Sequence, residues 1–97
     1  MASVMFSKAE LENMGVKLLS LEELQNVSPG DWVDCDVLHQ SLLHSGFNAR
    51  YENVVSDKAG FVAKFFIDEV FFGTVEGSDI GHMVREWHGD ELSSLVV

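Results

Sequence analysis

The sequence predicts an α+β fold in which a three-stranded antiparallel sheet packs on helices. One observation is the run from Phe61 to Val75, which is rich in aromatic and β-branched residues and is interrupted at Asp68-Glu69. Such a run is typical of two strands joined by a tight turn. The other observation is a serine followed three positions later by a carboxylate, which is a typical helix start and recurs at Ser7, Ser20 and Ser28. We therefore expect a small two-layer domain over residues 1–97 with the element order α-α-α-β-β-β-α.

Three helices are expected in the first half of the chain, over residues 8–14, 21–26 and 29–45. Pro29 suits the first position of the third helix, and Gly46 suits its end. A strand over residues 32–37 remains an alternative, because Val33, Cys35 and Val37 alternate with aspartates. The short helices of residues 1–27 are expected to cover the core that residues 28–97 form.

Three strands are expected next, over residues 47–55, 61–67 and 70–75. A two-residue turn at Asp68-Glu69 would fix the register of the last two strands, although Asn-Gly or Asp-Gly is the usual choice and a longer loop is an alternative. On the face toward the helices, the expected pairs are Ile67–Val70, Phe65–Phe72 and Ala63–Thr74. On the far face, the expected pairs are Phe66–Phe71, Lys64–Gly73 and Val62–Val75.

A final helix is expected over residues 79–88, because Ile80, Met83, Val84 and Trp87 recur at helical spacing. Residues 90–97 then form a docked extra turn or a frayed tail. The apolar far face of the sheet needs a cover, which is either the N-terminal helices or another chain. We expect the N-terminal helices, because layers normally close within a domain.

The net charge of −10 limits the classes of partner. Nucleic acid and anionic membranes both bind basic surfaces, so neither is expected as a direct partner. The charge fits a protein partner with a basic surface, or it only keeps the protein dispersed. The single cysteine, Cys35, excludes an internal disulfide. With no signal peptide at the start and no apolar run of membrane-spanning length, a cytoplasmic location is expected.

Catalytic and metal sites are weighed at Cys35 and His39, which lie four residues apart on a helix and so share a face. A zinc site needs three or four converging ligands, and a nucleophilic cysteine needs an exposed thiol of low pKa. Cys35 lies on the predicted apolar face beside Asp34 and Asp36, which disfavours the thiolate. We therefore expect no catalytic residues, no metal, no cofactor and no enzymatic activity.

Residues 29–95 resemble double-stranded RNA-binding domains in their expected order of helix, three strands and helix. Tyr51, Phe61 and Phe72-Gly73 look like that family's strand positions. The resemblance implies the family's α-β-β-β-α topology. However, residues 56–60 contain no Gly-Pro-x-His, and residues 79–83 contain no lysine cluster. The family's RNA-contacting motifs are therefore absent, and the resemblance implies topology without RNA binding.

The expected function is that of a small acidic protein that binds and inhibits another protein. It would block a nucleic-acid-binding surface, as phage and mobile-element proteins do against restriction or CRISPR nucleases. The alternative is a protein-interaction or dimerisation module, so that the chain is a monomer or a homodimer. The expected partner-binding residues combine carboxylates with the far-face aromatic pair: Asp31, Asp34, Asp36, Asp68, Glu69, Glu76, Phe66 and Phe71.

Overall fold

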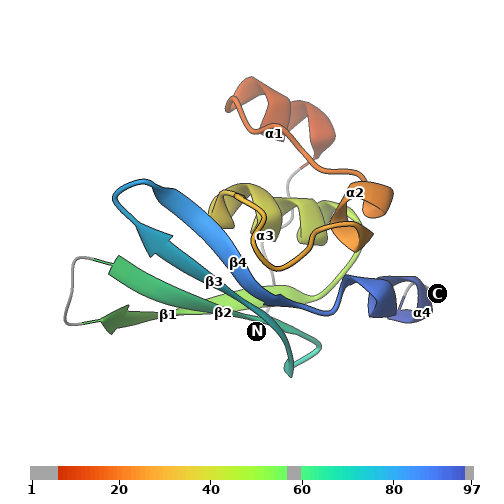
Figure 1. Ribbon diagram of the computed structural model, residues 1–97. Coiled ribbons are helices and arrows are strands. Elements are labelled where there is room, and N and C mark those ends of the chain that lie inside the picture. Colours follow the sequence, from red (N-terminus) through yellow and green to blue (C-terminus); the bar gives the residue numbers. More distant parts are fainter. Residues whose placement is uncertain (1–6, 57–59, 96–97) are drawn as a thin grey trace.

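The computed structural model describes residues 7–56 and 60–95, and Figure 1 shows their arrangement. An antiparallel four-stranded sheet in the order β1-β2-β3-β4 carries the helices on one face. The α+β class is confirmed, with one strand more than predicted. The elements are α1 Lys8–Asn13, α2 Leu21–Gln25, α3 Cys35–His44, β1 Ala49–Ser56, β2 Gly60–Ile67, β3 Val70–Ser78, β4 Gly81–Trp87, the 3₁₀ turn η1 Gly89–Glu91 and α4 Leu92–Leu95.

The expected helix over residues 79–88 is wrong, because this segment forms β4. A register shift between Thr74 and Val75 places Val75 opposite Val84 and Thr74 opposite Glu86, so Arg85 is an extra residue in β4. Because of the bulge, Val84 and Trp87 both point into the core although they are three positions apart in the sequence. This bulge accounts for the spacing of Val84 and Trp87, whereas Ile80 is exposed before β4 and Met83 is on the other face of the sheet. With a strand in place of the last helix, the resemblance to double-stranded RNA-binding domains fails beyond β3.

Helix α3 begins at Cys35, six residues later than predicted, and its N-cap is Asp34 rather than Ser28. The Asp34 Oδ1 atom accepts the backbone amides of Asp36 and Val37 at 2.9 and 3.3 Å. Ser28 and Asp31 instead close a turn, in which the Ser28 amide donates to Asp31 Oδ2 at 2.6 Å. The predicted end is confirmed, since Gly46 has a positive φ of 92° and the Phe47 amide returns to the Leu42 carbonyl at 3.0 Å.

The segment before α3 borders the outer edge of β4, but the alternative strand over residues 32–37 is wrong, because α3 already begins at Cys35. Trp32 bridges Met83, the Val33 amide donates to the His82 carbonyl at 2.9 Å, and the Val84 amide donates to the Asp31 carbonyl at 2.8 Å. This pairing covers part of one sheet edge.

The two-residue turn at Asp68-Glu69 is confirmed, and both residues have positive φ, 52° and 66°. The pairs Ile67–Val70 and Phe66–Phe71 are confirmed as well. A bulge between Phe65 and Phe66 then shifts the register by one residue, so the other four predicted pairs are wrong. The observed pairs are Phe65–Gly73, Lys64–Thr74, Ala63–Val75 and Val62–Glu76. Val75 consequently lies in the core and not on the far face.

The core lies between the sheet and the helical layer. Leu38 and Leu42 of α3 pack with Phe65 and Val75 in one buried cluster, which also includes Leu24 of α2. Polar contacts fix the N-terminal segment to the rest of the fold: Trp87 Nε1 donates to the Leu24 carbonyl at 2.8 Å, and the Leu19 amide donates to Ser41 Oγ at 2.9 Å. Leu92 is buried as well, so the described part of the C-terminal segment is a docked turn.

The helices α1 and α2 lie on the same side of the sheet as α3 (Figure 1). The expectation that they cover the far face is therefore wrong for the described residues. The Leu11 and Leu24 side chains of α1 and α2 are buried on the helical side. Among residues 7–56 and 60–95, no helix lies over the second face of the four-stranded sheet (Figure 1).

Candidate functional site: the open face of the sheet

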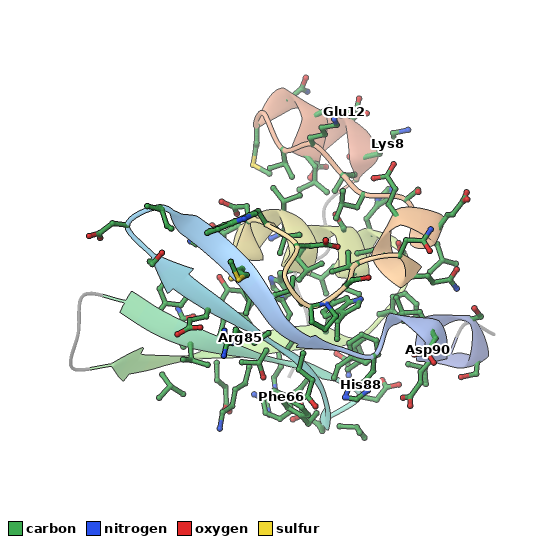
Figure 2. All side chains as sticks on the ribbon, viewed as in Figure 1. Lys8, Glu12, Phe66, Arg85, His88 and Asp90 are labelled. Atoms are coloured by element: carbon green, nitrogen blue, oxygen red, sulfur yellow. The ribbon has the colours of Figure 1, made fainter. Side chains whose placement is uncertain are left out.

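We call this second face of the sheet, over which none of the described helices lies (Figure 1), the open face. The strand register arranges its side chains in three rows across the strands. The rows are Arg50, Phe66 and Phe71; Glu52, Lys64, Thr74 and Glu86; and Val54, Val62, Glu76 and Met83, with Trp32 beyond the edge. Figure 2 shows Phe66 and Arg85 on the side of the sheet opposite to Glu12 and Lys8 of α1.

The first row contains an aromatic pair that is accessible to a partner. The rings of Phe66 and Phe71 meet edge-to-face, with centroids 6.1 Å apart, and His88 contacts Phe71 at 6.4 Å. Phe71 remains 39% exposed. Phe66 is half-buried because the guanidinium of Arg50 lies over its ring, with Cζ 4.4 Å from the centroid.

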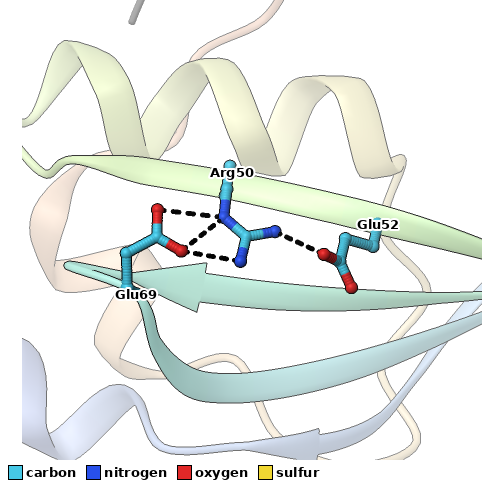
Figure 3. Close-up of polar contacts among 3 residues, drawn as sticks. All are labelled: Arg50, Glu52 and Glu69. Atoms are coloured by element: carbon cyan, nitrogen blue, oxygen red, sulfur yellow. Dashed lines mark hydrogen bonds and ion pairs between the residues drawn. The ribbon is translucent and has the colours of Figure 1, made fainter. Parts of the chain in front are cut away.

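Two carboxylates hold Arg50 in this position, as Figure 3 shows. Glu69 contacts Arg50 through both oxygens: Nε lies 3.1 Å from Oε1, while Nε and Nη2 lie 2.8 and 2.7 Å from Oε2. Glu52 Oε1 accepts from Nη1 at 2.8 Å. These hydrogen bonds raise the pKa of Arg50 and lower the pKa of Glu69. The Arg50 side chain is therefore oriented before any partner arrives.

Glu69 occupies a backbone conformation that glycine would adopt more readily. Both turn residues lie in the left-handed region, which the two-residue hairpin turn of type I′ requires. A left-handed residue with a side chain costs about 1–2 kcal/mol. Glu69 therefore has a strained backbone conformation, and its side chain contacts Arg50 on the open face.

A shallow hollow of about 490 Å³ lies in the second and third rows. It is lined by Val62, Thr74, Glu76, Arg85 and Glu86. Arg85 Nε lies 3.4 Å from Glu76 Oε2, so charges of both signs border the hollow, and Val62 adds an apolar side chain. The hollow can admit a side chain from a partner next to the aromatic pair.

The structure brings together some of the predicted site residues. Phe66, Phe71, Glu69 and Glu76 lie on the open face or at its rim, and Asp68 is exposed in the same turn as Glu69. Asp31, Asp34 and Asp36 lie elsewhere, between the segment before α3 and its first turn. Each has a local role: Asp31 and Asp34 accept backbone amides, and Asp36 accepts the Tyr51 hydroxyl at 2.7 Å.

Arg50 and Trp32 are surface residues that sequence reasoning missed. The position of Arg50 over Phe66 follows from the β1–β2 register, in which the two residues are direct partners. The sequence alone did not predict which residues of β1 and β2 are partners. Trp32 is half-exposed at the edge of β4, where it bridges Met83.

The Cys35 and His39 side chains have separate environments. Cys35 is buried, and burial raises the pKa of its thiol to about 12, with Asp34 and Asp36 adding to the effect. His39 Nε2 lies 3.1 Å from the Ala49 carbonyl, and its ring contacts Tyr51. Within residues 7–56 and 60–95, no three His, Cys, Asp or Glu side chains gather as metal ligands would.

Alkaline pH should destabilise the fold through Cys35. Its pKa rises from 9.0 to about 12 in the native protein, so the unfolded chain loses this proton first as pH increases. The unfolded state then binds fewer protons between about pH 9 and 12, and the free energy of unfolding must fall across that window. Urea denaturation at pH 7.5 and pH 10.5 should show a smaller loss in Cys35→Ala than in the wild type. Equal losses in the two proteins would contradict the buried neutral thiol.

No helix among the described residues is long and apolar enough to cross a membrane. The chain matches no protein-family model, no curated protein and no solved structure at a significant level. The open face and its charges are therefore the basis on which function is inferred.

Proposed function

We propose that the protein is a non-enzymatic binding protein that docks another protein on its open face. The observation that carries the proposal is the Phe66–Phe71 pair, which lies on the open face beneath an oriented Arg50. Aromatic residues and arginine are enriched among the residues that dominate protein–protein affinity.

The chemistry of the open face specifies the kind of partner. Phe71 offers an exposed apolar edge, and the neighbouring hollow is bordered by both Arg85 and Glu76. A fitting partner therefore presents an apolar side chain for the aromatic pair and charged groups of both signs for the hollow. Arg50 is already positioned by Glu69, so little side-chain entropy remains to be lost there on binding.

A second candidate function is inhibition of a nucleic-acid-binding protein, and the acidity of the helical layer supports it. Residues 7–47 contain seven carboxylates and two lysines, a net charge of −5 from 2 − 7. Their acidic residues are all exposed, and the helices α1, α2 and α3 of this segment lie on the helical side of the sheet (Figure 1). A basic nucleic-acid-binding groove would attract this side. Binding through it should weaken steeply between low and high salt, which mainly apolar docking on the open face would not do.

Phe71→Lys should remove partner binding, and Val70→Lys is its matched control. Both changes add one charge to β3, but Val70 is an exposed neighbour whose side chain alternates to the other side of the strand. Loss of a central aromatic contact costs about 2 kcal/mol, so affinity should fall roughly 30-fold in Phe71→Lys and little in Val70→Lys.

The measurement is affinity capture from source cells on immobilised wild type and both variants, followed by titration of the enriched protein. A protein retained by wild type and Val70→Lys but lost from Phe71→Lys supports the proposal. Equal retention by all three contradicts it. Mass in solution, measured on the same samples, identifies the partner as a second copy if the wild type and Val70→Lys are dimers and Phe71→Lys is a monomer.

A further inference from the structure

A second hollow, which we call the Trp32 groove, lies where the start of α3 meets the β3–β4 turn. Its volume is about 350 Å³, and it is lined by Trp32, Val33, Asp34, Ile80, Gly81 and His82. Phe71 is near the start of β3 and Ile80 follows the end of that strand, so the groove and the aromatic pair are at opposite ends of β3.

The walls of the groove are fixed by backbone pairing. The Asp31 carbonyl and the Val33 amide bond to β4 on either side of Trp32. Gly81 lies against the indole, because a Cβ at this position would come within 3.1 Å of Trp32 Cε3. His82 Nδ1 accepts the Cys35 amide at 3.2 Å and ties β4 to the first turn of α3. The groove therefore exists before any ligand binds.

Two large apolar side chains are exposed at this groove without a role in the core. Trp32 is 51% exposed and Ile80 is 81% exposed. The turn between β3 and β4 needs no large apolar residue, since Asp79 and Ile80 both lie outside the strands. Exposed tryptophan in a hollow is typical of a contact with another molecule.

The charge around the groove has one sign. Residues 28–36 and 77–84 contain no lysine or arginine, and their four carboxylates are Asp31, Asp34, Asp36 and Asp79, since Glu76 is paired with Arg85 on the open face. Asp34 lines the groove itself, and it accepts the Asp36 and Val37 amides through Oδ1. An indole beside a carboxylate attracts a cation through both the ring face and the negative charge.

We propose that the Trp32 groove binds an arginine side chain of a basic protein partner. The guanidinium stacks on the Trp32 indole and pairs with Asp34, while its methylene groups contact Ile80. Arginine fits better than lysine, because its planar guanidinium is weakly hydrated, stacks on aromatic rings and pairs with a carboxylate through two donors. The inference rests on the proposal that the protein binds a protein partner, but it uses a different surface.

The two tryptophans make this inference directly testable by NMR of their indole N–H groups. Trp87 is 8% exposed and its Nε1 is bonded to the Leu24 carbonyl, so its signal is an internal control. A blocked tetra-arginine peptide should shift the Trp32 signal in a saturable way and leave Trp87 unchanged. A tetra-citrulline peptide, which has the same shape without the charge, should shift neither signal.

The Asp34→Asn variant removes the charge and keeps the helix cap, because asparagine caps as well as aspartate. It should weaken tetra-arginine binding roughly fivefold or more, the effect of losing about 1 kcal/mol. Glu12→Gln on α1 removes the same charge away from the groove (Figure 2) and should change the affinity little. Trp32→Leu should abolish the stacking contribution, with the thermal midpoint as a check on folding.

Equal weakening by Asp34→Asn and Glu12→Gln would overturn the inference, because the peptide would then be responding to net charge. An unshifted Trp32 signal, or equal binding of tetra-citrulline, would overturn it as well. The Phe71→Lys protein should bind tetra-arginine like the wild type. A failed peptide titration therefore contradicts the Trp32 groove inference and not the open-face proposal. If Phe71→Lys does not affect partner capture, the open-face proposal is contradicted and the Trp32 groove inference is not.

Discussion

Phe65→Ala should cost about 3–5 kcal/mol of folding free energy, whereas Phe66→Ala should cost about 1 kcal/mol. The two residues are adjacent in β2 but face opposite sides of the sheet. Phe65 is 0% exposed, stacks on Tyr51 at 5.0 Å and contacts the Trp87 ring at 6.3 Å. Phe66 lies on the open face between Phe71 and Arg50, so its removal leaves no enclosed cavity. Urea denaturation of both variants measures the difference.

Partner binding should show the reverse order. Phe66→Ala removes half of the aromatic pair and the surface under Arg50, so its affinity for the partner should fall although the protein stays folded. If Phe66→Ala instead destabilised the protein as much as Phe65→Ala, the sheet would be covered on both faces, and the open face would not exist in solution.

Replacing Asp68-Glu69 with Asn-Gly should stabilise the protein by about 1–2 kcal/mol and weaken partner binding. Both native residues have positive φ, which asparagine and glycine adopt with less strain. For a domain of this size, that gain raises the thermal midpoint by about 4–8 °C per kcal/mol. The loss of binding follows from the loss of the Glu69 carboxylate, which orients Arg50 over Phe66.

The single change Asp68→Asn is the control for this turn variant, because it relieves part of the strain and keeps Glu69. Its stability should rise slightly and its affinity for the partner should be unchanged. A double variant that is less stable than the wild type would mean that the Arg50–Glu69 contact serves the fold. A more stable double variant with full affinity would remove Glu69 from the binding site.

The sequence predicts elements that depend on local chemistry. Ser7 and Ser20 cap α1 and α2 as predicted, accepting the Glu10 and Glu23 amides at 3.1 and 3.2 Å. The hairpin turn at Asp68-Glu69 also depends on a few adjacent residues. Ser28 has the same spacing to Asp31, but here the bond runs from the Ser28 amide to the carboxylate and closes a turn. Residue spacing alone does not distinguish the two arrangements.

The strand β4 could not be predicted, because a bulge that forms only on pairing with β3 turns Val84 and Trp87 to the same side. The bulge at Phe65/Phe66 has the same effect on the register of β2 and β3, and it moves Val75 from the far face into the core. The candidate site was predicted in part. Phe66, Phe71 and Glu69 were named from the hairpin, but Arg50 depends on the pairing of β1 with β2. The aspartates were grouped by sequence proximity, whereas each has its own local hydrogen bond.

Photo-crosslinking from the open face tests the central claim most directly. Benzoylphenylalanine placed at position 71 lies beside Phe66, while the same group at position 14 lies on the exposed end of α1, on the helical side. Irradiation in source cells should link position 71 to one protein and give no such product from position 14. A crosslink from position 14 with none from position 71 would contradict docking on the open face.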